Sequence, residues 1–152
     1  MSTTRLVRRI RAPRSAEYGA LLDAQAVQHW MVPDGMTSEV HVFDPREGGV
    51  FHISLTYVMP TAAGKTSAQT DSFHGRFVEL VPDSKVVQLV EFETDDPAMQ
   101  GEMTITYLLA DATDGTDFVG LHEGLPPGVS PVDNELGWND SIDKLATLLE
   151  AR

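Results

Sequence analysis

The side chains best suited to chemistry in this sequence are five histidines, at positions 29, 41, 52, 74 and 122. No two of them have the His-x-x-x-His or His-Glu-x-x-His spacing of a helical zinc site, and no carboxylate is placed as a recognisable third ligand. The chain has no cysteine, which excludes disulfides, thiolate nucleophiles and cysteine-bound metals. The sequence therefore predicts neither a metal site nor a cofactor, and it predicts no catalytic residue outright.

His122 is the titratable residue best placed to face a cavity. Strand alternation puts it on the side of Phe118 and Gly120, which we predict faces inward. We favour a satisfied, partly buried histidine, with a ligand-orienting or acid/base role as the alternative. Tyr57 and Tyr107 can present phenol donors in the same way, although ordinary amphipathic core tyrosines are the favoured interpretation.

Arg8 shares a strand face with Leu6 and Ile10, so its guanidinium is predicted to point inward at one end of the cavity. Because arginine cannot lose its charge, burial requires a partner such as Glu91 or Glu93, or a ligand carboxylate. A structural ion pair, or a head group that reaches solvent, is the favoured interpretation.

The elements that must position these residues are mostly β-strands. Alternating apolar and polar residues predict strands over 4–11, 39–44, 50–57, 72–80, 85–93, 102–109 and 116–123. A short helix after Pro13 is predicted to run to about residue 23, and a second helical turn carries Val27, Trp30 and Met31. Segment 59–70 has no periodicity and is predicted to be a long loop.

The strongest helix signal lies near the C-terminus. Residues 130–133, Ser-Pro-Val-Asp, combine a capping serine, a proline at the first helical position and an acid in the first turn. Trp138, Ile142, Leu145 and Leu149 then form one apolar stripe. An antiparallel sheet of about seven strands needs a cover, and this predicted helix is long enough to provide it. The predicted fold class is α+β, with the sheet wrapped around the C-terminal helix and two short helices after strand one.

Several short motifs occur along the chain in an order typical of one family. They are Ala12-Pro13, Trp30 with Pro33 and Gly35, Phe-Asp-Pro-Arg-Glu-Gly-Gly over 43–49, Gly-Arg-Phe-Val-Glu-Leu-Val-Pro over 75–82, and Gly137-Trp138. The chain thereby resembles the START/Bet v-like helix-grip (SRPBCC) superfamily, in the branch of proteins like the homologue of the heat-shock-protein-90 ATPase activator. This resemblance implies a cavity between the sheet and the C-terminal helix that holds small apolar or amphipathic molecules.

We therefore predict that the protein binds a small hydrophobic or amphipathic molecule and is more a binding protein than an enzyme. The residues predicted to line the cavity are Arg8, Trp30, Phe51, Ile53, Tyr57, Phe73, Phe77, Phe92, Met103, Tyr107, Phe118, His122, Trp138 and Ile142. A core filled by these same side chains is the competing interpretation.

Two other functions stay open at this point. One is an enzyme of the cyclase or dehydratase type, with His122 and Tyr107 as acid/base groups. The other is a protein-binding module, chaperone-linked in keeping with the family resemblance, that uses an acidic surface and associates with a basic partner in a salt-sensitive way.

Length and charge limit the partners. The 152 residues are expected to form a single domain, 1–152, and the 11 basic against 23 acidic residues give a net charge of -12. Such a charge repels nucleic acid and anionic membranes, so we predict that the protein binds neither of them. The five arginines in the first fourteen positions do not change this prediction, because the rest of the chain is strongly acidic. Without a signal-like or spanning apolar segment we expect a cytoplasmic protein. A homodimer through a sheet edge or segment 59–70 is possible on these grounds.

Overall fold

The computed structural model describes residues 2–58 and 70–151. The elements in chain order are β1 (Ser2–Ile10), α1 (Arg14–Leu21), α2 (Ala24–Trp30), β2 (Met36–Phe43), β3 (Val50–Tyr57), β4 (Thr70–Val81), β5 (Lys85–Phe92), the 3₁₀ turn η1 (Pro97–Met99), β6 (Met103–Ala112), β7 (Gly115–Leu125) and α3 (Pro131–Glu150). The predicted α+β class, with two short helices after the first strand and a long C-terminal helix, is confirmed.

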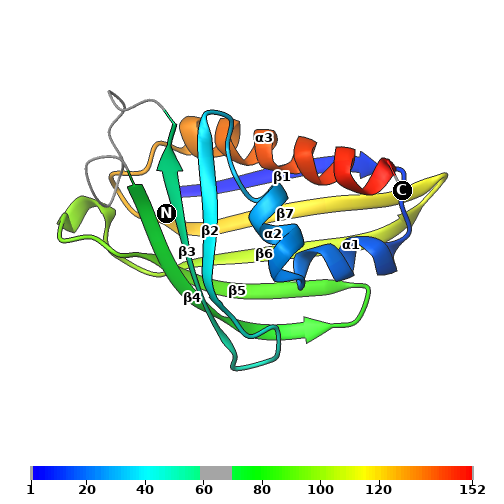
Figure 1. The fold of residues 1–152 in the computed structure, drawn as a ribbon, viewed down its shortest axis with the longest axis horizontal. Coiled ribbons are helices and arrows are strands. Elements are labelled where there is room, and N and C mark those ends of the chain that lie inside the picture. The colour runs from blue at the N-terminus through cyan, green and yellow to red at the C-terminus, as the bar shows by residue number, and fades with distance from the viewer. Residues whose placement is uncertain (1, 59–69, 152) are drawn as a thin grey trace.

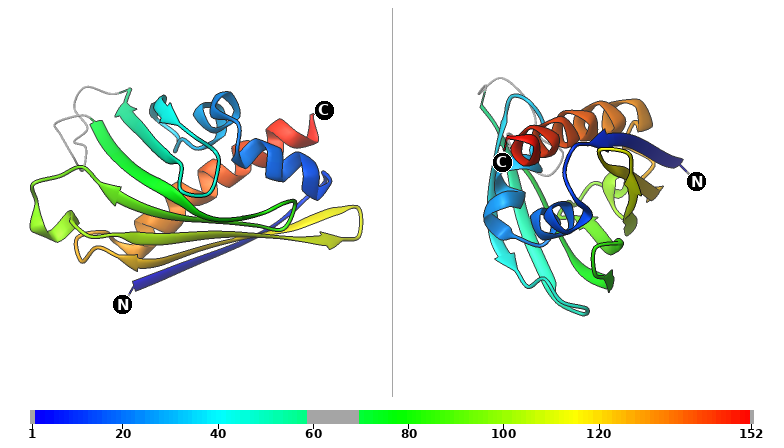
Figure 2. Two further views of the ribbon diagram at one scale, coloured as in Figure 1. Left: turned by 90° about the horizontal axis from the view of Figure 1, so that it is seen from below. Right: turned by 90° about the vertical axis from the view of Figure 1, so that its right-hand side faces the viewer.

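The strands form one seven-stranded sheet in the order β1-β7-β6-β5-β4-β3-β2, and each neighbouring pair is antiparallel. The first strand, β1, therefore forms one edge of the sheet beside the last strand, β7, and β2 forms the opposite edge. The sheet curls so that its inner face surrounds the helices, with α3 along the β1 side and α1 and α2 further across (Figures 1 and 2). Bulges in β2 and β4 contribute to this curvature, because an extra residue bends a strand.

Helix α3 begins where the capping signal predicts. The hydroxyl of Ser130 accepts a hydrogen bond from the backbone N–H of Asp133 at 3.2 Å, and Pro131 occupies the first turn. Ile142, Leu145 and Leu149 of the predicted stripe are buried, whereas Trp138 is half-buried. The stripe thus seats the C-terminal half of α3 against the sheet and leaves its N-terminal half near a cavity.

Element ends differ from the predictions where alternation is weak. Strand β2 begins at Met36, three residues before the predicted start at Glu39, and β4 begins at Thr70. The segment after Thr94, between two of the predicted strands, contains η1, whose first turn is capped by Asp96. Most of the loop predicted over 59–70 lies outside the described residues.

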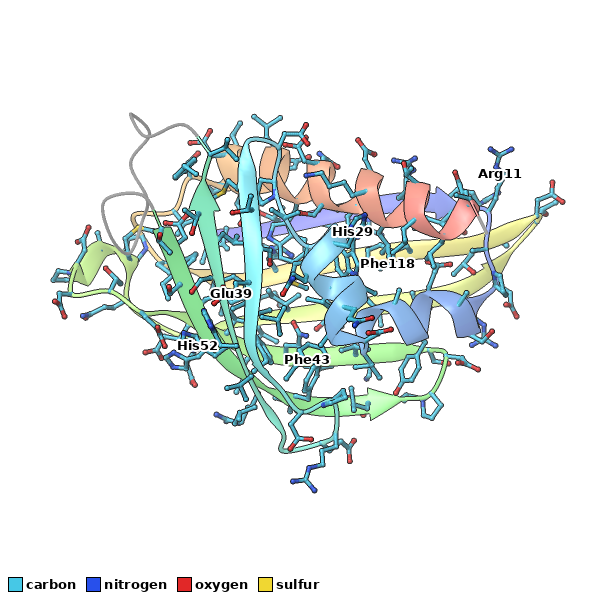
Figure 3. The ribbon with its side chains drawn as sticks, in the orientation of Figure 1. Arg11, His29, Glu39, Phe43, His52 and Phe118 are labelled. Atoms are coloured by element: carbon cyan, nitrogen blue, oxygen red, sulfur yellow. The ribbon has the colours of Figure 1, made fainter. Side chains whose placement is uncertain are left out.

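One end of the inner face is filled by aromatic rings. Phe51 and Phe77 pack with ring centroids 5.3 Å apart. Phe43, labelled in Figure 3, meets Phe77 edge-on at 5.5 Å. Gly75 permits this packing, since a β-carbon there would lie 2.6 Å from the ring of Phe51 and 2.1 Å from the carbonyl oxygen of Leu89. This end of the fold is therefore solid core.

The N-terminal arginines form ion pairs with neighbouring strands and approach the end of α3. Arg9 pairs with Asp117 of β7 at 2.6 Å, and Arg14 pairs with Asp111 of β6 at 2.9 Å. Arg11 lies near the C-terminal end of α3, where its Nε is 3.9 Å from a carboxylate oxygen of Glu150 (Figure 3).

In the described part of the chain, none of the helices has the length and apolar character needed to cross a bilayer.

Candidate ligand-binding cavity

A cavity of about 270 Å³ lies between the inner face of the sheet and the N-terminal half of α3. Strands β3 to β7 supply its floor and walls, and α3 covers it with one side of its first three turns. An engineered apolar cavity of about 150 Å³ holds benzene. The space is therefore large enough for a small organic molecule.

Most of the wall is apolar. Alternate residues of β5 and β6 face inward and form much of this wall, namely Val90, Phe92, Met103 and Ile105. Phe73 of β4 adds another ring. Flexible methionine side chains can adapt to ligands of different shape, and the wall also includes those of Met31 and Met99. Such a surface favours apolar molecules through burial of their surface.

His122 provides a polar group within this wall. It is 1% exposed, and its ring meets that of Trp138 edge-on with centroids 4.4 Å apart. The side-chain amide nitrogen of Asn134 lies 3.0 Å from Nδ1 of His122, whereas Nε2 is buried and has no hydrogen-bond partner among the described residues. Burial lowers the pKa of His122 to about 4, so the imidazole is neutral at physiological pH.

The rim is formed where the loop after β7 enters α3. Ser130 and Asp133 line the cavity and are also exposed, so this part of the wall reaches the surface. Gly128 holds the loop against η1 through a hydrogen bond from its N–H to the carbonyl of Ala98 at 2.6 Å. A β-carbon on Gly128 would lie 2.8 Å from both that carbonyl oxygen and the sulfur of Met99. The rim therefore depends on a close backbone approach.

Five of the fourteen residues predicted from the sequence lie on this wall, namely Phe73, Phe92, Met103, His122 and Trp138. The other nine lie outside it. Trp30, Phe51, Ile53, Phe77, Tyr107, Phe118 and Ile142 are buried in the core, and Tyr57 is half-buried near the end of β3. The competing interpretation of a filled core thus describes half of the predicted set.

Arg8 does not point into the cavity. It pairs with Asp143 on the exposed side of α3, not with Glu91, Glu93 or a ligand. Both side chains keep substantial contact with solvent, at 40% and 65% exposure, so the pair contributes little to stability. Arg8 has a structural ion pair, the interpretation favoured from the sequence.

Tyr107 lies behind the cavity and not on its wall. Its ring packs among those of Trp30, Phe118 and Trp138, at centroid distances of 6.5, 5.6 and 6.1 Å. The hydroxyl is buried without a hydrogen-bond partner among the described residues, and burial raises the pKa of Tyr107. The structure therefore does not bring the proposed acid/base pair of His122 and Tyr107 to one surface.

Most residues that line the cavity were not predicted from the sequence. Unpredicted lining residues include Met31, Leu55, Gln88, Val90, Met99, Ile105, Val129 and Asn134. Val90, Gln88 and Ile105 occupy inward positions of β5 and β6, so the same alternation that found Met103 contains a signal for them. Asn134 and Met99 had no comparable signal, because their positions depend on how a helix start and a 3₁₀ turn meet the sheet.

Three other histidines gather on adjacent strands away from the cavity. Glu93 accepts hydrogen bonds from His52 at 3.0 Å and His74 at 3.1 Å, and His41 lies 3.0 Å from a carboxylate oxygen of Glu39. Among the described residues, no group of three or more histidine or acidic side chains has an arrangement that could hold a metal ion. Glu93, which follows β5, thus joins β3 and β4 through these histidines.

Comparison with known proteins identifies the family to which this fold belongs. Residues 11–150 match the family described as activator of Hsp90 ATPase homolog 1-like protein. The chain belongs to this family. The match extends over most of the chain and confirms the resemblance seen in the short motifs. No curated protein matches the sequence.

Solved structures support the same assignment. A crystal structure of a protein from Chromobacterium violaceum has 34% sequence identity, covers 97% of this chain and 96% of that chain, and superposes with a TM-score of 0.87. The AHSA1 protein from Silicibacter pomeroyi has 18% identity, covers 99% of each chain and gives a TM-score of 0.81. A protein from Rhodobacter sphaeroides has 18% identity and a TM-score of 0.81, with 99% of this chain and 93% of that chain covered. The helix-grip fold is common to all three.

Proposed function

We propose that this protein reversibly binds a small hydrophobic or amphipathic molecule in the cavity between the sheet and α3. The observation that carries the proposal is the cavity of about 270 Å³ beside a tightly packed aromatic core. Well-packed interiors contain few voids larger than a water molecule. A largely apolar cavity with a few polar groups is the usual form of a small-molecule site.

The polar groups of the wall support binding over catalysis. His122 lies in the cavity, but Tyr107, its predicted partner in an acid/base reaction, is enclosed by other rings. Asn134 holds one nitrogen of His122 and thereby fixes the ring. A fixed imidazole on an apolar wall can orient one polar group of a bound molecule while burial of the rest supplies affinity.

Titration with N-phenyl-naphthylamine, an uncharged dye that fluoresces in apolar surroundings, tests this proposal. We expect saturable emission at one dye per chain for the unchanged protein. Met103→Trp places a larger side chain in the cavity and should weaken binding by about tenfold or more. Leu108→Trp is the matched control, since Leu108 lies on the same strand but is 40% exposed, and it should bind as the unchanged protein does.

Native mass spectrometry of the purified protein, followed by extraction, should identify any molecule that it retains. Binding that Met103→Trp and Leu108→Trp affect equally would place the dye elsewhere and contradict the proposal. Absence of dye binding by all three proteins would also contradict it. A cytoplasmic location and a homodimer stay predictions.

A further inference from the structure

The side chain of Asn134 determines which ring nitrogen of His122 carries the proton. The side-chain nitrogen of Asn134 donates to the hydroxyl of Thr4 at 3.3 Å and lies 3.0 Å from Nδ1 of His122. An amide nitrogen carries only hydrogens and can only donate. Nδ1 must therefore accept, and in the neutral ring the proton is on Nε2.

This arrangement leaves a buried donor without an acceptor. Nε2 of His122 has no hydrogen-bond partner among the described residues, and the side chain is 1% exposed while lining the cavity. A buried N–H without a partner costs free energy, which an acceptor on a bound molecule recovers. On the adjacent strands, Ile105 pairs with His122 and Gln88 pairs with Ile105, so Gln88 lies across the floor from this donor.

The charges around the cavity limit which acceptor fits. Its described lining residues include the carboxylates of Asp71 and Asp133 but neither lysine nor arginine. His122 is neutral at physiological pH because burial lowers its pKa to about 4. Among the described lining residues, a ligand carboxylate therefore finds no cation, and it loses its hydration on entry, which disfavours anions. An uncharged oxygen does not meet this obstacle.

We propose, building on the function proposed above, that the cavity selects uncharged small molecules whose polar group is a hydrogen-bond-accepting oxygen, such as a ketone, ester or ether. The acceptor oxygen binds Nε2–H of His122, and the apolar part lies against the methionine and phenylalanine side chains. Asn134 acts as a positioning residue, because it selects the tautomer without contacting the ligand.

Three probes of nearly equal shape separate the polar contact from apolar burial: acetylnaphthalene, ethylnaphthalene and naphthoate. Isothermal titration calorimetry at about pH 7 should show acetylnaphthalene binding about fivefold more tightly than ethylnaphthalene, the value of one ordinary hydrogen bond. Naphthoate should bind more weakly than acetylnaphthalene. His122→Phe keeps a ring against Trp138 but removes the donor, so the ketone and the hydrocarbon should then bind equally.

Each contrary result has a distinct meaning. This inference is overturned if the unchanged protein binds the ketone no more tightly than the hydrocarbon, or if His122→Phe still prefers the ketone. It is also overturned if naphthoate binds as tightly as the ketone. The proposed binding function survives those results if ethylnaphthalene binds. Failure of all three probes overturns both proposals. If His122→Phe does not fold, ¹⁵N NMR of the unchanged protein decides, since a proton on Nδ1 of His122 overturns the inference.

Discussion

At the scale of single residues, Glu17 is a buried carboxyl group that the proposed function does not use. It lies in α1 at 0% exposure, and neither carboxylate oxygen has a hydrogen-bond partner among the described residues. Burial raises the pKa of Glu17 to about 7, against a smaller opposing effect of Thr116.

Glu17→Gln should therefore stabilise the protein in a pH-dependent way. Because the pKa is about 7 in the folded chain against 4.5 ordinarily, stability is lost as the pH rises from about 4.5 to 7. Near pH 8 the substitution should increase the free energy of unfolding by about 3 kcal/mol, and near pH 4 by almost nothing. Urea denaturation at both values measures this difference.

Glu135→Gln, at an exposed position of α3, is the control for replacing a charge with an amide. It should change the free energy of unfolding little at either pH. An equal gain for Glu17→Gln near pH 4 and pH 8 would show that side-chain packing, and not ionisation, causes the stabilisation.

At the scale of elements, α3 contains a glycine that a helix does not need. A β-carbon on Gly137 would lie 3.7 and 4.0 Å from the Cγ and Cβ atoms of Pro33, which are ordinary contacts. Gly137→Ala should therefore add about 0.5–1 kcal/mol to the free energy of unfolding through helix propensity alone. Thermal and urea denaturation both measure it, and destabilisation would mean that the cavity rim resists even a methyl group.

The loop that enters α3 gives the opposite expectation. Gly128→Ala pushes the backbone away from η1, because the new carbon meets Ala98 and Met99 at 2.8 Å. We expect a loss of about 1–3 kcal/mol in unfolding free energy and weaker binding of N-phenyl-naphthylamine. Gly19→Ala is the control, since no heavy atom lies within 4 Å of its added carbon. Unchanged dye binding in Gly128→Ala would separate the rim from the site.

The elements themselves were largely predictable from local pattern. The burial of β6 alternates from Met103 onward as the sequence predicts, and α3 begins at its capping serine, because these signals act within a few residues. The position of the cavity along the strands was not predictable. Phe51 and Phe92 both occupy inward strand positions, yet one lies in the core and the other on the wall, since sheet curvature and helix placement decide between them.

At the scale of the whole molecule, two buried titrations oppose each other. Burial raises the pKa of Glu17 to about 7 and lowers that of His122 to about 4, from ordinary values of 4.5 and 6.5. Between about pH 4.5 and 6.5, the folded chain holds a proton on Glu17 that the unfolded chain lacks. Over the same range the unfolded chain holds a proton on His122 that the folded chain lacks. The two contributions to the pH dependence of stability therefore nearly cancel.

Single substitutions should reveal this cancellation. Glu17→Gln leaves only the effect of His122, so its stability relative to the unchanged protein should fall as the pH decreases from about 6.5 to 4.5, by up to about 1.4 kcal/mol per pH unit. His122→Phe leaves only the effect of Glu17, and its relative stability should rise over the same range. The double variant should again parallel the unchanged protein, because the two groups lie on different elements and their effects should add. Urea denaturation of all four proteins measures the slopes, and parallel curves for the single variants would contradict the burial of both groups.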